Sequence, residues 1–206
     1  MINLTVTRDK FNKALGHINR KGVPELVSWL ETTDFFMAPA STNFHGNYDG
    51  GLMEHSVHVV EFGLTNFNYM VKYKPQLEYL KESVILVGLF HDVCKVNQYS
   101  KGQKWLKDET TNKWKSYMGY QFKDDLPLGH GEKSLYLISK FVELKDNEAL
   151  AVRWHMGCSE VGTQIDGLTK YSYNTAWENP LVQLIHVADM ASLLISETID
   201  YKSQAQ

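Results

Sequence analysis

The residues in this sequence with the clearest capacity for chemistry are an adjacent histidine and aspartate, His91 and Asp92, which follow the apolar run SVILVGLF. Burying such a polar pair is costly unless it has a partner. A cation is a suitable partner, because an imidazole nitrogen and a carboxylate oxygen are both metal ligands. The dipeptide alone does not decide between a metal site and a pair that faces solvent at the end of a helix.

Two further residues match this pair in type. His55 lies in the earlier segment GGLMEHSVHV, and Asp189 lies in LIHVADMAS among apolar and small residues. An aspartate in such a stretch needs a partner. Together with the pair, these residues offer two imidazoles and two carboxylates from three predicted helices. This set suits a divalent cation that keeps open positions for water and substrate.

The order His55, His91-Asp92, Asp189 resembles that of the HD-domain metal-dependent phosphohydrolase superfamily. The segment GGLMEHSVHV is similar to the first motif of several HD families. LVGLFHDVCKV resembles their apolar helix with its His-Asp pair and following lysine, although Cys94 stands where many members carry glycine. The resemblance spans residues 50–199 apart from the predicted hairpin. It implies a helical HD-domain bundle.

Two more histidines, His130 and His155, fall in the intervals where binuclear HD subfamilies carry extra histidines. The resemblance implies that they complete a second metal site and that Asp92 bridges the two ions. The expected cofactor is one or two divalent ions, from among Mn, Mg, Fe, Ni and Zn. Other roles stay open: His130 can be a neighbour of a helix N-cap, and His155 a core or phosphate-contacting imidazole.

Such a site would hydrolyse phosphoesters with metal-activated water, because two cations roughly 3.5–4 Å apart can hold a hydroxide and neutralise phosphoryl oxygens. Lys95 is the leading candidate for charge stabilisation, in a catalytic set with Asp92 and His58. Arg153 can make a bidentate contact with a phosphate, or it can form an ordinary surface salt bridge. His58, one helical turn from His55, is a proton donor, a supporting residue or an ordinary helix histidine.

A β-hairpin is predicted within residues 96–122, around the turn sequence DETTN. Six lysines lie between positions 95 and 115, interleaved with aromatic residues, a pattern that can hold a phosphate and stack a base. The hairpin is therefore a candidate lid or wall of the substrate site, with Tyr99 and Lys104 as contacts; an ordinary exposed hairpin is the alternative. His45, in the loop before His55, is a further candidate substrate contact.

Apolar periodicity places these residues on helices. Residues 157–179 read as a connection with little periodicity. The fold class is thus mainly α, in one HD-type domain: N-terminal helices and loop at 1–48, a metal-binding core at 49–95 and 126–200, and a hairpin insertion at 96–125. The predicted helices cover residues 9–19, 25–31, 52–71, 77–93, 131–144, 146–156 and 180–199.

Composition limits the classes of protein. The apolar fraction of 43% supports a sizeable core, and the net charge of −3 argues against a stable complex with a large nucleic acid. Cys94 and Cys158 are too few for a disulfide framework. With no signal peptide and no apolar run of ~20 residues, the expected setting is the cytoplasm, away from membranes. An oligomer stays possible.

The expected function is therefore a metal-dependent phosphohydrolase that acts on a nucleotide or a short oligonucleotide. Two alternatives remain. One is a di-iron oxygenase of the myo-inositol oxygenase type, a family that uses the same ligand order and a lysine after the His-Asp pair. The other is a metal-binding module without activity.

Overall fold

The chain is mainly helical with one small antiparallel sheet, which confirms the predicted fold class at this level. The computed structural model describes residues 3–158 and 166–204. Within these ranges, no helix combines the length and hydropathy that a membrane crossing needs.

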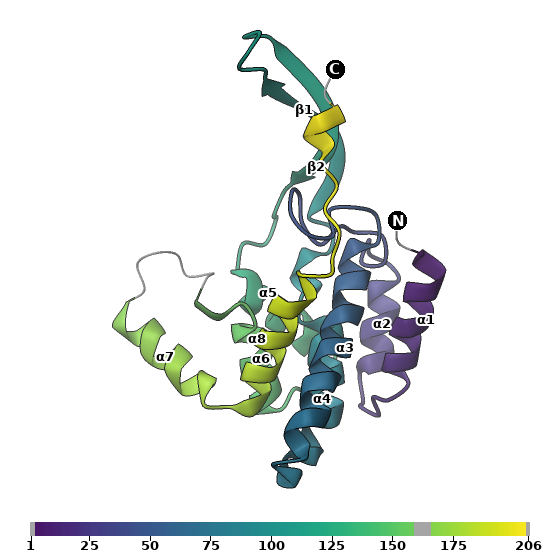
Figure 1. Cartoon of the computed structure of the whole chain (residues 1–206). Coiled ribbons are helices and arrows are strands. Elements are labelled where there is room, and N and C mark those ends of the chain that lie inside the picture. The colour runs from purple at the N-terminus through teal and green to yellow at the C-terminus, as the bar shows by residue number, and fades with distance from the viewer. Residues whose placement is uncertain (1–2, 159–165, 205–206) are drawn as a thin grey trace.

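Three helices form the centre of the structure: α3 (Gly51–Val71), α4 (Lys81–Phe90) and α8 (Pro180–Ser192) (Figure 1). Every residue of α4 from Ser83 onward is buried, as expected for a helix that is apolar all round. α3 packs against both of the other helices. The polar residues carried by these three helices therefore meet inside the core.

Two glycines let α3 and α4 approach closely. A Cβ atom on Gly88 would lie 2.9 Å from Cγ2 of Val60, and one on Gly63 would lie 3.0 Å from Cγ1 of Val84. Larger residues at either position would push the helices apart. This contact brings His55 of α3 next to the end of α4.

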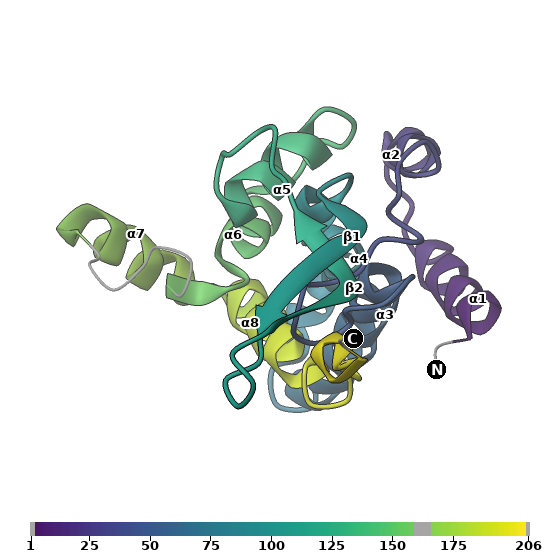
Figure 2. The same cartoon turned by 90° about the horizontal axis from the view of Figure 1, so that it is seen from above.

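The remaining helices flank this centre on two sides (Figure 2). On one side, α1 (Leu4–Leu15) packs against α3 and α4, and α2 (Val23–Leu30) lies on this same side of the body. On the other side, α5 (His130–Ser139) packs against α6 (Asp146–Trp154), which in turn packs against α8. The side with α5 and α6 supplies the two extra histidines.

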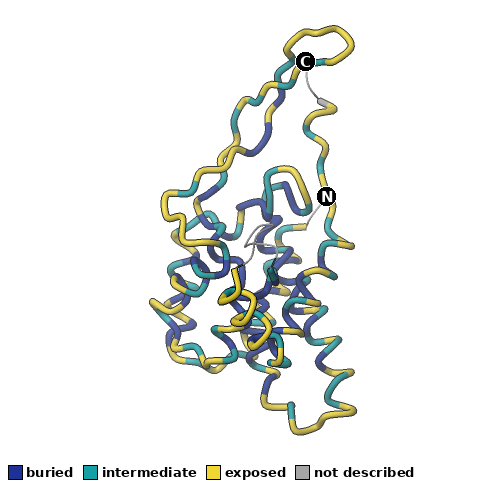
Figure 3. The backbone as a smooth tube through the Cα atoms, turned by 90° about the vertical axis from the view of Figure 1, so that its left-hand side faces the viewer, coloured by how far each residue is buried: buried dark blue, intermediate teal, exposed yellow. Residues whose placement is uncertain are grey.

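The predicted hairpin is present, with strands β1 (Tyr99–Lys107) and β2 (Trp114–Phe122) paired from Tyr99↔Phe122 to Lys107↔Trp114. It projects from the helical body, and the C-terminal segment with the 3₁₀ helix η4 (Tyr201–Gln204) runs beside it (Figure 1). Its tip is exposed, whereas parts of β2 nearer the body are buried (Figure 3).

Some helix boundaries differ from those predicted. The first helix covers Leu4–Leu15 instead of residues 9–19, because the side chain of Asn3 caps it and accepts a hydrogen bond from the Val6 N–H at 3.2 Å. The helices predicted at 131–144 and 180–199 end earlier, at Ser139 and Ser192.

The helix predicted at residues 77–93 is interrupted at both ends. A 3₁₀ helix, η1 (Pro75–Leu80), precedes α4, and another, η2 (Val93–Lys95), follows it. The break lies at Asp92, whose φ of −106° and ψ of 16° are not those of an α-helix. The chain thus leaves helical geometry at the His-Asp pair.

The connection predicted at residues 157–179 was wrong in its second half, which forms α7 (Gly167–Trp177). Asp166 caps this helix by accepting a hydrogen bond from the Thr169 N–H at 2.7 Å. Tyr173 and Trp177 pack against the core, whereas most of the helix projects from the body (Figure 2). Residues 159–165 of the predicted connection lie outside the described residues.

Candidate metal centre

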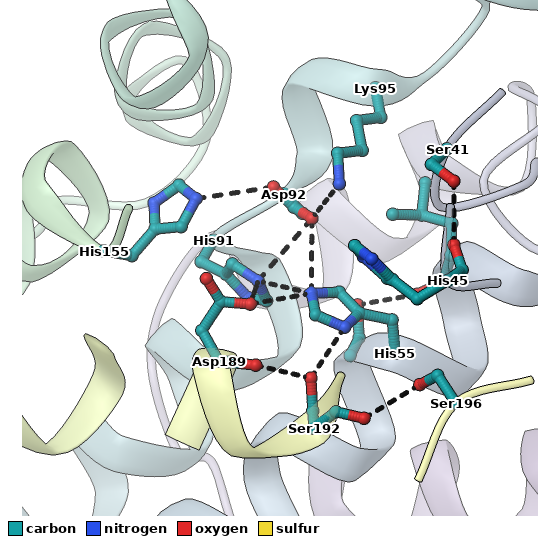
Figure 4. Close-up of polar contacts among 12 residues, drawn as sticks. Ser41, His45, His55, His91, Asp92, Lys95, His155, Asp189, Ser192 and Ser196 are labelled. Atoms are coloured by element: carbon teal, nitrogen blue, oxygen red, sulfur yellow. Dashed lines mark hydrogen bonds and ion pairs between the residues drawn. The ribbon is translucent and has the colours of Figure 1, made fainter. Parts of the chain in front are cut away.

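Six polar side chains converge at one place inside the helical body. Five helices contribute them, either from within a helix or from the residue that ends it. Burial is nearly complete for all but the residue from α5. They are His55 on α3, His91 and Asp92 at the end of α4, His130 at the start of α5, His155 after α6, and Asp189 on α8 (Figure 4 labels all but His130).

The tightest group surrounds Nε2 of His55. This atom lies 3.2 Å from Nε2 of His91 and 3.1 Å from Oδ1 of Asp189. Oδ2 of Asp92 lies 3.4 Å from the His55 nitrogen and 3.6 Å from that of His91. His55, His91 and Asp92 are close enough together to hold a metal ion.

The other oxygen of Asp92 faces a second group. Oδ1 lies 2.5 Å from Nε2 of His130 and 3.5 Å from Nε2 of His155. The buried thiol of Cys94 lies 3.3 Å from Nδ1 of His130, and Asp92, Cys94 and His130 form a second set close enough to hold an ion. The two oxygens of one carboxylate thus face two different groups of ligand atoms.

The outer nitrogens of the buried histidines have their own partners. Nδ1 of His91 lies 3.0 Å from the Gly88 carbonyl oxygen, and Nδ1 of His155 lies 2.7 Å from that of Val152. A carbonyl oxygen only accepts, so each Nδ1 carries the proton and donates it. In the neutral ring each Nε2 is then the unprotonated ligand atom, and it faces the cluster. Such outer hydrogen bonds are typical of histidines that bind metals.

Charge in the cluster also suits a cation. Burial lowers the pKa of His91 to about 3, so this ring is neutral at pH 7. Burial by itself would raise the pKa of Asp92, but Lys95 and the histidines hold it well below its ordinary value. Burial opposes ionisation of Asp189 in the same way, and His55 lowers its pKa. Burial by itself would lower the pKa of His55 and His155, but Asp92 and Asp189 raise it. Two ionised carboxylates thus lie buried beside the neutral His91 ring, in a setting that favours positive charge.

Unpaired atoms support the same conclusion. Nε2 of His155 and Oδ2 of Asp189 are buried without a hydrogen-bond partner among the residues that the structure describes. Leaving a buried polar atom unpaired costs free energy. Both atoms are of types that bind divalent metals, so the residues present fit a metal ion.

A Ser192→Ala variant is expected to lower metal affinity by about 10- to 100-fold. The Ser192 hydroxyl lies 3.0 Å from Nδ1 of His55 and donates to the Asp189 carbonyl oxygen at 2.7 Å, so it orients one ligand and contacts the backbone of another. Competition with a metal-binding dye measures the affinity. The matched control is Ser196→Ala, which removes a hydroxyl that donates to the Ser192 carbonyl oxygen. Equal affinity in both variants would rule out this orienting role.

A cavity of about 300 Å³ opens over the cluster. His55, Asp92, His130 and Asp189 line it, and so do three residues predicted to act on the substrate: His45, Lys95 and Tyr99. The His45 ring centroid lies 5.4 Å from that of His55, and burial lowers the pKa of His45 to about 4. Figure 4 shows the Lys95 side chain reaching Asp92.

Three other predicted residues do not line this cavity. Lys104 donates a hydrogen bond to the Tyr120 carbonyl oxygen at 3.1 Å within the hairpin. Arg153 pairs with Glu132 and lies 4.0 Å from the Trp154 ring centroid, as in the surface alternative. His58 is half-buried, burial lowers its pKa, and its Nδ1 has no hydrogen-bond partner among the described residues. Their predicted roles have no support from this geometry.

Sequence reasoning missed several residues at the site. Phe44 and Phe122 line the cavity, and Ser192 orients His55. Ser192 lies one helical turn after Asp189, which is a weak signal. The two phenylalanines carry no signal, because their positions depend on how the loop and the hairpin fold back over the cluster.

The described residues thus form a buried histidine–aspartate cluster that can hold a metal ion, at the floor of an open cavity. Comparison of the chain with protein-family models, with curated proteins and with solved structures gave no match.

Proposed function

We propose that this chain is a metal-dependent phosphohydrolase of the HD-domain type, acting on a nucleotide or a short oligonucleotide. The observation that carries the proposal is the position of Asp92, whose two oxygens face two separate groups of histidines at the floor of a cavity. A carboxylate between two groups of ligand atoms suits a site with two metal ions, which is an arrangement that hydrolytic enzymes use. The ligand order along the chain, which resembles that of HD domains, supports the same function.

In this proposal His55, His91 and Asp189 would hold one divalent ion, and His130 and His155 would hold a second. Asp92 would be a ligand of both. When bound, the ions would lower the pKa of water and neutralise charge on a phosphoryl group. The protein fixes the ligands through the outer hydrogen bonds of His91 and His155.

Lys95 is the residue of this chain placed to contact the phosphoryl group. Its ammonium lies 2.6 Å from Oδ2 of Asp92, and the residue lines the cavity. Burial by itself would lower the pKa of this ammonium, but the Asp92 carboxylate raises it above its ordinary value. Lys95 therefore keeps its positive charge at pH 7, where it can stabilise charge that develops on phosphoryl oxygens.

A Lys95→Met variant is expected to lose about 10²- to 10³-fold in kcat, because one fixed charge at the reacting group is removed. Its metal content should stay near that of the unmodified chain, since lysine is not a ligand in this proposal. Phosphate release and metal analysis measure the two quantities. Lys107→Met, at an exposed hairpin position, is the control. A kcat within about twofold of the control would remove Lys95 from the mechanism.

The function itself is tested by metal analysis of the purified chain. Phosphate release is then screened over nucleotides, dinucleotides and cyclic nucleotides with added Mn, Mg, Ni or Fe. Metal-dependent hydrolysis of one of these classes is the expected result. Stoichiometric iron with oxygen uptake, and no hydrolysis of any nucleotide, would replace this proposal with an oxygenase.

A further inference from the structure

The cavity over the metal centre has two chemically different parts. Its floor carries the ligands and the Lys95 ammonium, which are charged or strongly polar. Its walls are largely apolar, and three of their side chains are aromatic: Phe44, Tyr99 and Phe122. A molecule that fits both parts has an anionic group at one end and an apolar, ring-shaped group at the other.

The three aromatic residues are here called the aromatic wall, and two of them are largely exposed. Phe44 is 71% exposed and Phe122 is 58% exposed, although both line the cavity. Tyr99 and Phe122 are direct partners across the hairpin, with ring centroids 5.8 Å apart and an interplanar angle of 52°. Exposed aromatic faces beside a polar site are surfaces on which a flat ring can stack.

Both segments that carry the aromatic wall are fixed to the fold. In the loop before α3, the Phe44 N–H donates to the Ser41 hydroxyl at 2.9 Å, and the Gly46 N–H donates to the Glu197 carbonyl oxygen at 2.8 Å. Such a surface binds at low entropic cost because it is already ordered.

Asp49 joins this loop to the hairpin. Its carboxylate accepts a hydrogen bond from the Tyr120 hydroxyl at 2.5 Å and pairs with the Lys101 ammonium at 2.6 Å. The two walls that bear Phe44 and Phe122 are therefore connected directly. These two contacts hold the loop and the base of the hairpin together.

We propose that the aromatic wall binds the base of a nucleotide whose phosphate lies at the metal centre. This inference rests on the proposed function and adds the part of the substrate that is recognised. Phe44 and Phe122 then select nucleotides over phosphate esters that lack an aromatic ring. Stacking uses the flat face that every base has. The aromatic wall should therefore distinguish a ligand with a base from one without a base more strongly than it distinguishes one base from another.

The outer hairpin is not part of this subsite. Trp105 is six residues along β1 from Tyr99, which places it about 20 Å further from the body at ~3.3 Å per residue. A mononucleotide at the metal centre does not span that distance. The predicted wall of the substrate site is thus the base of the hairpin, next to Tyr99 and Phe122.

The test uses adenosine, which has a base and no phosphate, and ribose 5-phosphate, which has a phosphate and no base. Saturation-transfer NMR and competition titrations measure the binding of each to the full chain and to a Phe44→Ala/Phe122→Ala variant. The variant is expected to weaken adenosine binding by about 10-fold or more. It should leave ribose 5-phosphate binding unchanged. A Trp105→Ala/Trp114→Ala variant of the outer hairpin is the control and should bind both ligands normally.

Two results would overturn the inference: no saturation transfer to adenosine in the unmodified chain, or equal adenosine binding in the Phe44→Ala/Phe122→Ala variant. Neither bears on hydrolysis, because adenosine carries no phosphoester. If nucleotides are hydrolysed but the Phe44→Ala/Phe122→Ala variant binds adenosine as the unmodified chain does, the proposed base subsite is wrong and the proposed function stands. If adenosine binds through them but no nucleotide is hydrolysed, the subsite stands and the reaction is wrong.

Discussion

An Asp92→Asn variant is expected to bind divalent metal more than about 100-fold more weakly, exceeding the loss typical of a residue that only orients a ligand. The rate of phosphate release by this variant should fall in proportion to its loss of bound metal. Asp92 is 2% exposed, and its two oxygens face different groups of histidines. An asparagine keeps the shape but has one oxygen, and its amide nitrogen does not coordinate metal. Metal content by mass spectrometry and phosphate release measure the two losses.

The matched control is Asp108→Asn at the tip of the hairpin. Asp108 is a carboxylate of the hairpin turn that pairs with Lys115 at 2.9 Å, far along the strands from the cluster. This variant should keep metal and activity. Circular dichroism checks that the Asp92→Asn chain is folded. A folded Asp92→Asn chain with normal metal content would show that the histidine groups do not depend on this carboxylate.

The centre of the site could be predicted because the types of the ligand residues and the apolar runs around them can be read from the sequence. His91 and Asp92 follow an apolar run, so a polar pair must be buried or must end the helix there. The structure places them at the end of α4, with both side chains buried. The hairpin was equally visible, since its turn sequence is flanked by segments of strand-forming residues.

Other features depend on contacts between distant segments and could not be predicted. Phe44 reaches the cavity because the loop before α3 is bonded to the C-terminal segment: the Asn47 side chain exchanges two hydrogen bonds with the Ile199 backbone, each 2.7 Å long. α7 has weak apolar periodicity because only its last part packs on the core. Local sequence does not reveal either arrangement.

A Glu148→Ala variant is expected to lower the free energy of unfolding by about 3 kcal/mol. Glu148 is fully buried, and its carboxylate accepts hydrogen bonds from Arg20 at 2.9 and 3.2 Å, from Ser83 at 2.6 Å and from the Lys145 N–H at 2.8 Å. These partners lie in the linker between α1 and α2, on α4, and at the start of α6. Alanine would remove an acceptor that all three segments share and would leave the buried Ser83 hydroxyl without its carboxylate partner.

For a chain of this size, the loss corresponds to a fall in Tm of about 6–12 °C, measured by thermal unfolding. The control is Asp146→Ala, which removes an exposed carboxylate from the first turn of the same helix and should cost under about 1 kcal/mol. Similar Tm values for the two variants would show that Glu148 does not hold the three segments together.

The same residue makes stability depend on pH in a definite direction. Burial by itself would raise the pKa of Glu148, but hydrogen bonds from Arg20, Ser83 and Lys145 lower it below its ordinary value of 4.5. The Glu148 carboxyl therefore binds a proton more readily in the unfolded chain than in the folded one. The contribution of the ionised carboxylate to the free energy of unfolding is complete above about pH 4.5, and it shrinks as the pH falls through the folded-state pKa. A Glu148→Gln variant lacks the titrating group. The difference in unfolding free energy between the unmodified chain and this variant should therefore narrow below about pH 4.5, and a constant difference would exclude the ionised carboxylate as its source.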